Sequence, residues 1–173
     1  MTLKEKNKST TDRQQTGEGI PEIIVPRLNA VFWMDGEGAW YNKGGRFELK
    51  KIIRRFNASI EKDADGYYVT QINGNRREKV YFPYEDTALF AIDIQKKEPM
   101  TMRLNTGQRL PLNPAAIYNS EENLYTCHEG EWIKFSERSL LKLSSIIDFE
   151  TNPFTLHYCG CTYSILPKPL HSP

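Results

Sequence analysis

The sequence has few cysteines, no long apolar run and no strong excess of one charge. Three cysteines among 173 residues are too few and too unevenly placed for a disulfide scaffold. No apolar run approaches the ~18 residues of a membrane-spanning helix, and residues 1–22 contain no hydrophobic segment of the signal-peptide type. We therefore expect a soluble, cytoplasmic protein with reduced thiols and no membrane partner.

The sequence also lacks the short motifs that mark common catalytic sites. It contains no phosphate-binding loop, no dinucleotide-binding GxGxxG, and no HExxH, GxSxG or CxxC. Its net charge of +1 gives little general attraction for a polyanion such as nucleic acid. These absences identify no reaction, and we expect no cofactor.

A repeated pattern is the most informative feature that is present. Residues 31–72 and residues 116–165 each read as strand, turn, strand, helix, turn and strand. An apolar fraction of 39% and an aromatic fraction of 12% are enough to build a real core in a chain of this length. The pattern predicts an α+β fold of two β-rich, roll-like lobes, each with one helix, that arose by internal duplication.

Composition divides the chain into four segments. Residues 1–19 are polar and charged, with no apolar period, which predicts a disordered tail. We expect an N-terminal α/β roll lobe over residues 20–110 and a C-terminal β-rich roll lobe over residues 111–166. Residues 167–173 hold three prolines and predict a second, short tail. Two related lobes imply a groove between them.

Local signals place the helices and several hairpins. The clearest helix is predicted by apolar residues at helical spacing, namely Leu49, Ile52, Ile53, Phe56 and Ile60. Turn residues at 35–38, 73–75 and 105–107 predict β-hairpins. Ser136 is expected to cap the second helix. Residues 154–166 are expected to form one last strand.

Several short motifs, in this order, resemble the bacterial family catalogued as domain of unknown function 1285. They are FWMDGEGAWYNKGG (32–45), LKKIIRRF (49–56), DADGYYVT (63–70), YEDTALFAIDI (84–94) and MRLNTG (102–107). The resemblance covers roughly residues 31–165. It implies an N-terminal α/β roll followed by a C-terminal β-rich roll, and it implies no activity and no catalytic residue.

The leading hypothesis is a non-enzymatic module that binds a small molecule or a protein in the groove between the lobes. A cleft of this kind is a common place for a ligand. The residues expected to line the groove are four aromatics and one acid, namely Trp33, Trp40, Tyr41, Tyr67 and Asp86. Exposed sheet edges leave a homodimer open.

An enzyme that uses cysteine and histidine, with or without zinc, is the first alternative. The candidate ligands are Cys127, His157, Cys159 and Cys161. Thiolate and imidazole suit zinc, although these residues lack the tight CxxC spacing of structural zinc sites. The competing interpretation is that Cys159 and Cys161 are small core residues, because free cysteine is among the most buried residue types. We favour cysteines that are structural and metal-free.

Single-stranded nucleic-acid binding is the second alternative. A basic patch is expected on the outer face of the first helix, formed by Lys50, Lys51, Arg54 and Arg55. Basic groups beside aromatic residues are what such binding uses. The near-neutral chain favours a plain solvated helix face instead, so a nucleic-acid partner is not expected.

Overall fold

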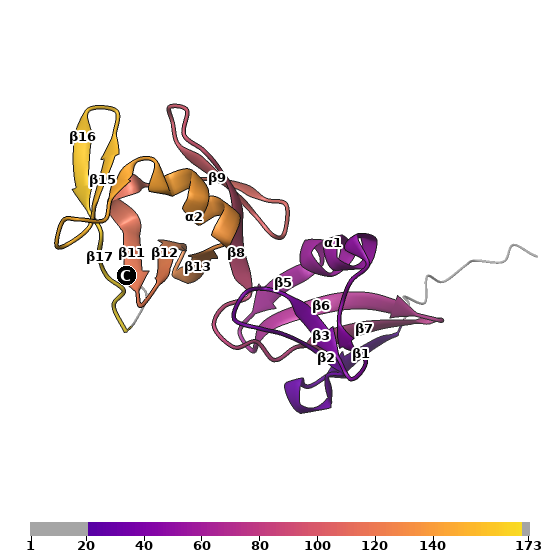
Figure 1. The fold of residues 1–173 in the computed structure, drawn as a ribbon. Coiled ribbons are helices and arrows are strands. Elements are labelled where there is room, and N and C mark those ends of the chain that lie inside the picture. Colours follow the sequence, from indigo (N-terminus) through magenta and orange to yellow (C-terminus); the bar gives the residue numbers. More distant parts are fainter. Residues whose placement is uncertain (1–20, 171–173) are drawn as a thin grey trace, which may run out of the picture.

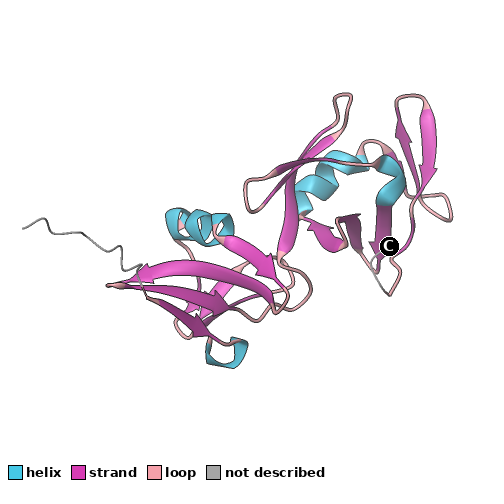
Figure 2. Ribbon diagram, turned by 180° about the vertical axis from the view of Figure 1, so that it is seen from behind, coloured by secondary structure: helices cyan, strands magenta, loops and turns pink. Residues whose placement is uncertain are grey.

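The computed structural model describes residues 21–170, which fold into two β-rich lobes joined by the segment that leads into β8 (Figure 1). The predicted tail 1–19 lies outside the described residues, as do residues 171–173. Strands dominate both lobes (Figure 2), and each lobe carries one α-helix and one short 3-10 helix. The predicted α+β class is confirmed. No helix in the described part of the chain is long and apolar enough to cross a membrane.

The N-terminal lobe combines two sheets with the helix α1. The larger sheet has the strand order β1-β7-β6-β5, and the smaller is the meander β2-β3-β4. Their elements are β1 (Glu22–Val25), the short 3-10 helix η1 (Arg27–Asn29), β2 (Phe32–Met34), β3 (Trp40–Asn42), β4 (Gly45–Arg46), α1 (Lys50–Ala58), β5 (Ile60–Asp63), β6 (Gly66–Asn73) and β7 (Arg76–Tyr81). The predicted hairpins at 35–38 and 73–75 are therefore confirmed.

The helix α1 lies over an aromatic core and is only partly covered. Trp40 and Phe82 are almost fully buried, and the ring of Phe56 packs edge-on against Trp40 at 5.2 Å between centroids. Ile53 and Phe56 face this core, as the helical spacing predicted. No residue of α1 is fully buried, however, and Ile52 remains 42% exposed. Part of the predicted apolar stripe thus stays on the surface.

The C-terminal lobe is built on a seven-stranded sheet with the order β10-β9-β8-β13-β12-β11-β17, beside a three-stranded sheet β14-β15-β16. Its elements are β8 (Leu89–Gln95), β9 (Thr101–Leu104), β10 (Arg109–Pro111), η2 (Pro114–Ala116), β11 (Ile117–Ser120), β12 (Asn123–His128), β13 (Glu131–Phe135), α2 (Glu137–Ser144), β14 (Ile147–Asp148), β15 (Thr155–Tyr158), β16 (Cys161–Ser164) and β17 (Leu166–Pro167). Ser136 caps α2 by accepting the backbone N–H of Ser139, as predicted.

The boundary between the two lobes lies earlier in the sequence than residues 110 and 111, where it was predicted. The boundary predicted between residues 110 and 111 falls inside the seven-stranded sheet, because β8 pairs in parallel with β13. Ile94, Met102 and Leu104 share one core with Ile117 and Leu156. The change from one core to the other occurs within β8, where Phe90 belongs to the N-terminal core and Ala91 and Ile94 to the C-terminal one. Hairpin signals gave no information on which distant strand β8 would join.

Both lobes repeat the same succession of elements. Three strands, a helix and three strands run from β2 to β7, and the same series runs from β11 to β16. The sheets are connected differently, since β1 extends one end of the first series and β8 to β10 extend the second. The shared succession supports the repeat, while descent from an internal duplication stays a prediction.

The last predicted strand is instead a hairpin. Tyr158 pairs with Cys161, so Cys159 and Gly160 form a two-residue turn between β15 and β16. Both turn residues have positive φ, 50° and 75°, which is the turn that matches the twist of a hairpin. As a result Cys159 and Cys161 are exposed. The expectation that they are core residues is wrong, and Gly160 was the signal that pointed to the turn.

Candidate functional site

The five residues expected to line a groove between the lobes have three different environments. Trp40 is a core residue, 1% exposed, whose indole Nε1 donates to Oδ1 of Asn57 at 2.7 Å. Trp33 and Tyr41 are cross-strand partners on the outer face of the β2-β3 hairpin. Their rings stack with centroids 5.9 Å apart and planes inclined by 12°. These three residues therefore do not form one continuous lining.

The other two expected groove residues join the lobes to each other. The Tyr67 hydroxyl on β6 donates to Oε2 of Glu131 on β13 at 2.5 Å. Asp86 accepts from the Tyr125 hydroxyl on β12 at 2.7 Å. Burial, reinforced by these carboxylates, raises the pKa of both tyrosines above the ordinary value of 10. Both hydroxyls therefore remain protonated donors at neutral pH.

A buried lysine completes the junction between the lobes. The side chain of Lys134 is 5% exposed, and its Nζ donates to the backbone carbonyl of Gly36 at 2.6 Å and to Oε1 of Glu37 at 2.8 Å. It also lies 3.9 Å from Oδ2 of Asp86. The charge of Lys134, on the C-terminal lobe, is thus matched by Glu37 of the N-terminal lobe and by Asp86 of the connecting segment, as a buried ammonium requires. Paired side chains occupy this junction.

The cysteine and histidine candidates lie on different sheets. Cys127 is on β12 of the seven-stranded sheet, whereas His157 is on β15 of the small sheet, with its Nδ1 3.1 Å from the Thr162 hydroxyl. Cys159 and Cys161 lie at the β15-β16 turn. Among residues 21–170, no three His, Cys, Asp or Glu side chains are grouped as metal ligands would be.

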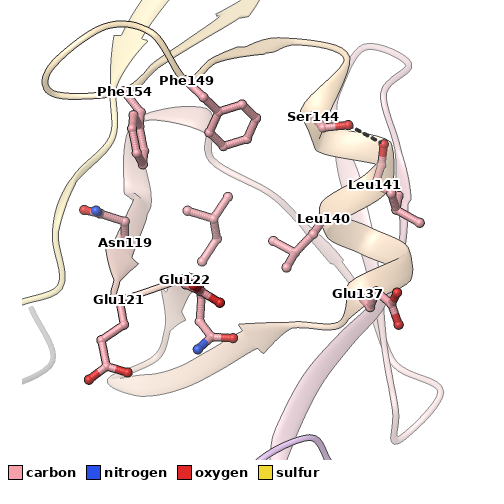
Figure 3. Close-up of a pocket in the computed structure, with 11 residues that line it drawn as sticks. Asn119, Glu121, Glu122, Glu137, Leu140, Leu141, Ser144, Phe149 and Phe154 are labelled. Carbon is pink, nitrogen blue, oxygen red and sulfur yellow. Dashed lines mark hydrogen bonds between the residues drawn. The ribbon is translucent and has the colours of Figure 1, made fainter.

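A cavity in the C-terminal lobe offers a more complete binding site, although none of the expected groove residues lines it. Its volume is about 410 Å³, and it opens between the β11-β12 hairpin, α2 and the loop that precedes β15 (Figure 3). The lining residues are Asn119, Glu121, Glu122, Asn123, Leu124, Glu137, Leu140, Leu141, Ser144, Phe149 and Phe154.

Apolar side chains form the interior of this cavity. Leu124 is 5% exposed, and Leu140 reaches from α2 toward the centre of the opening (Figure 3). Phe149 and Phe154 form one wall, with ring centroids 5.4 Å apart and planes at 69°. Phe149 is half exposed, which is unusual for a large apolar side chain. A small apolar group would gain most of its stabilisation by leaving water for this space.

Three carboxylates stand at the rim of the cavity. Glu121 and Glu122 form the turn between β11 and β12, and Glu137 begins α2. None of the three takes part in an ion pair with a described residue. The rim is therefore negative and can attract a cation at the mouth of an apolar space.

The backbone of the rim turn is strained. Glu121 has a φ of 54°, a left-handed conformation that costs a residue with a long side chain roughly 1–2 kcal/mol. Glu122 does not share this positive φ, and two-residue hairpin turns with positive φ at the first central residue alone favour Gly at that position. Two adjacent glutamates in a turn were the one signal in the sequence that could have identified this site.

Comparisons with known proteins support the fold. No protein-family model and no curated protein matches the chain. Among solved structures, a DUF1285 family protein from Silicibacter pomeroyi DSS-3 is 13% identical with a TM-score of 0.54, over 85% of this chain and 84% of that chain. A DUF1285 family protein from Shewanella baltica OS155 is 18% identical with a TM-score of 0.47, over 66% of this chain and 91% of that chain.

The first of these likenesses shows that the chain shares its fold with a solved structure over most of its length. The fold is that of a DUF1285 family protein, as the sequence motifs indicated. At this identity the likeness concerns the fold, and it assigns no ligand and no reaction to the residues of the cavity.

Proposed function

We infer that the protein is a non-enzymatic binding module whose C-terminal cavity takes a small apolar group that carries a positive charge. The single observation behind this inference is the pairing of an apolar interior with a rim of three carboxylates, Glu121, Glu122 and Glu137. The interior favours an aliphatic or aromatic group, and the rim favours an amine or guanidinium at its exposed end. The exposed thiols of Cys159 and Cys161 suit a reducing compartment, so we place this function in the cytoplasm.

The rim turn stores backbone strain, and a second left-handed glutamate in the same lobe allows the effect of strain to be separated from that of the rim. A left-handed glutamate persists where Asn or Gly would cost less, and such local conflicts with stability are concentrated at functional sites. Glu129 is a natural control within the same lobe. It has a φ of 52° in the β12-β13 turn, yet it does not line the cavity.

Calorimetric titration with octylammonium and octanoate tests the inference, because the two probes share a chain length and differ in charge. Octylammonium should bind, and octanoate should bind at least ~10-fold more weakly, since each unscreened charge contact is worth about 1 kcal/mol in water. Phe149→Ser should weaken octylammonium binding by removing part of the apolar wall.

The double change Glu121→Gln and Glu122→Gln should reduce the preference for the cation, whereas Glu129→Gln should leave it unchanged. Equal affinities of the native protein for octylammonium and octanoate would show that the rim does not select charge. The same conclusion would follow if the double variant and the Glu129→Gln control lost the preference for octylammonium to the same extent.

A further inference from the structure

The outer side of α1 is covered by no other described element (Figures 1 and 2), and together with the mostly exposed residues 43–49 before it this side forms a basic surface. We call it the α1 surface. It carries six exposed cations between residues 43 and 55, namely Lys43, Arg46, Lys50, Lys51, Arg54 and Arg55. Glu48 is the single acid in this interval. Within residues 21–170, none of the six cations forms an ion pair.

Exposed aliphatic side chains border these cations on one flank, where Ile52 lies next to Arg55 on one side and to Leu49 on the other. Leu49, directly before the first turn of α1, is 66% exposed, and Ile52 is 42% exposed. Shallow cavities of about 250 Å³ and about 210 Å³ open on either side of Ile52, which lines both. Ile72, 62% exposed, borders the first of them. The α1 surface therefore combines unpaired positive charge with apolar area that folding has left in water.

We propose that the α1 surface binds the surface of an anionic lipid bilayer. A helix with four or more cations and exposed aliphatic residues has the two features that hold a protein in the lipid interface, electrostatic attraction and shallow apolar insertion. Leu49 and Ile52 enter the headgroup region, while Lys50, Lys51, Arg54 and Arg55 contact the phosphates. The expectation of no membrane partner rested on the lack of a spanning segment, which peripheral binding does not require.

A lipid surface fits the α1 surface better than single-stranded nucleic acid does. Nucleic-acid binding of that kind needs exposed rings on which bases stack. Next to α1 the aromatic residues are Phe47 and Phe56, which are partly buried and packed edge-to-face against each other at 5.2 Å. Tyr41, the cross-strand partner of Arg46, already has its ring stacked on that of Trp33. The exposed apolar side chains at α1 itself, Leu49 and Ile52, are aliphatic, and aliphatic side chains insert among acyl chains.

The strength of this binding follows from the number of charges. Each Lys or Arg near an anionic membrane contributes about fivefold in affinity, so the four cations of α1 provide on the order of several hundred-fold. With a net charge of only +1 on the whole chain, the attraction is confined to this face and orients the molecule on the bilayer. The contact is salt-sensitive and reversible.

Co-sedimentation of the full chain with vesicles tests the proposal. Vesicles with about one third phosphatidylglycerol in phosphatidylcholine should sediment the protein, whereas phosphatidylcholine alone should not. The double change Lys50→Glu and Lys51→Glu should reduce binding at least ~100-fold by reversing two of the contacts. Leu49→Ser should reduce it several-fold because it removes the most exposed aliphatic side chain of the surface.

A matched control changes the same net charge on the other lobe. Lys97→Glu with Arg109→Glu alters two exposed cations away from α1, and it should retain most of the binding. Circular dichroism melting of each variant separates lost folding from lost binding. No binding to anionic vesicles by the native chain, equal losses in the two double variants, or unchanged binding in Leu49→Ser would overturn the proposal. Salt-sensitive retention of an oligothymidylate without vesicle binding would assign the α1 surface to nucleic acid instead.

Discussion

The hydroxyl of Tyr125, on β12, donates a 2.7 Å hydrogen bond to Oδ2 of Asp86, in the segment that leads from the N-terminal lobe into β8. Asp86 also lies 3.9 Å from Nζ of Lys134 and has Nζ of Lys168 3.8 Å from its other oxygen. The ammonium of Lys168 in turn sits 3.9 Å from the centroid of the Tyr125 ring. An acid that the sequence suggested for a ligand groove is therefore a central link between the two lobes.

Replacing Tyr125 with Phe should lower the free energy of unfolding by about 1.5–3 kcal/mol, because a hydrogen bond to a charged group is lost from a mostly buried position. Urea denaturation measures this change. Tyr118→Phe is the control, since Tyr118 packs edge-on against Trp132 and its hydroxyl has no hydrogen bond with a described side chain. A loss in Tyr118→Phe as large as that in Tyr125→Phe would assign the effect to ring packing.

Acid should weaken the N-terminal lobe through Asp63. The Lys79 ammonium and the Tyr81 hydroxyl donate to this carboxylate and hold its pKa at about 2, below the ordinary 3.8. Because the fold favours the ionised form, its contribution is fully present above pH 3.8 and is lost as the pH falls through about 2. Asp63→Asn should therefore be destabilising near neutral pH, and the difference from the native chain should shrink toward pH 2. A constant difference over that range would contradict the assignment.

Relieving the strained turns should stabilise the C-terminal lobe. Glu121→Asn and Glu129→Asn each place a residue that tolerates positive φ in a left-handed position, so each should gain about 0.5–1 kcal/mol. Thermal unfolding measures both. If the proposed cavity function is correct, Glu121→Asn also weakens octylammonium binding, while Glu129→Asn does not. Stabilisation of neither variant would show that the turns carry no strain.

The three thiols should react at different rates with a disulfide reagent such as dithionitrobenzoate. Cys159 and Cys161 are exposed and should be titrated rapidly in the folded protein. Cys127 is partly buried, and burial raises the pKa of its thiol, so its reactive thiolate is scarce. It should react fully only after unfolding. If only one thiol reacted rapidly, either Cys159 or Cys161 would have to be buried, which would contradict the structure.

The two faces of α1 should respond differently to a negative charge. Ile53→Asp puts a carboxylate against the aromatic core and should cost several kcal/mol. Lys51→Asp changes a solvated position and should stay within about 0.5 kcal/mol. Thermal melting curves of the two variants provide the comparison, and equal shifts would contradict the orientation of the helix.

Local sequence signals predicted most of the helices and hairpins. They did not predict which strands distant in the sequence would pair. Turn residues at 73–75 fix the β6-β7 hairpin, because a two-residue turn leaves the flanking strands only one register. The same reasoning missed the turn at Cys159 and Gly160, where cysteine stands in place of the usual Asn. The parallel pairing of β8 with β13 joins strands about 40 residues apart, and no local pattern encodes such a partner.

By itself the sequence determined the α+β class, the positions of both helices and the cations of α1, since spacing and turn chemistry act between neighbours along the chain. The tertiary structure decided where the lobes meet, because Lys134 of the C-terminal lobe is buried against Glu37 of the N-terminal lobe and Asp86 of the connecting segment. It also decided which residues surround a cavity. Glu121, Leu140 and Phe149 come from a turn, a helix and a loop, and only packing brings a negative rim and an apolar interior together.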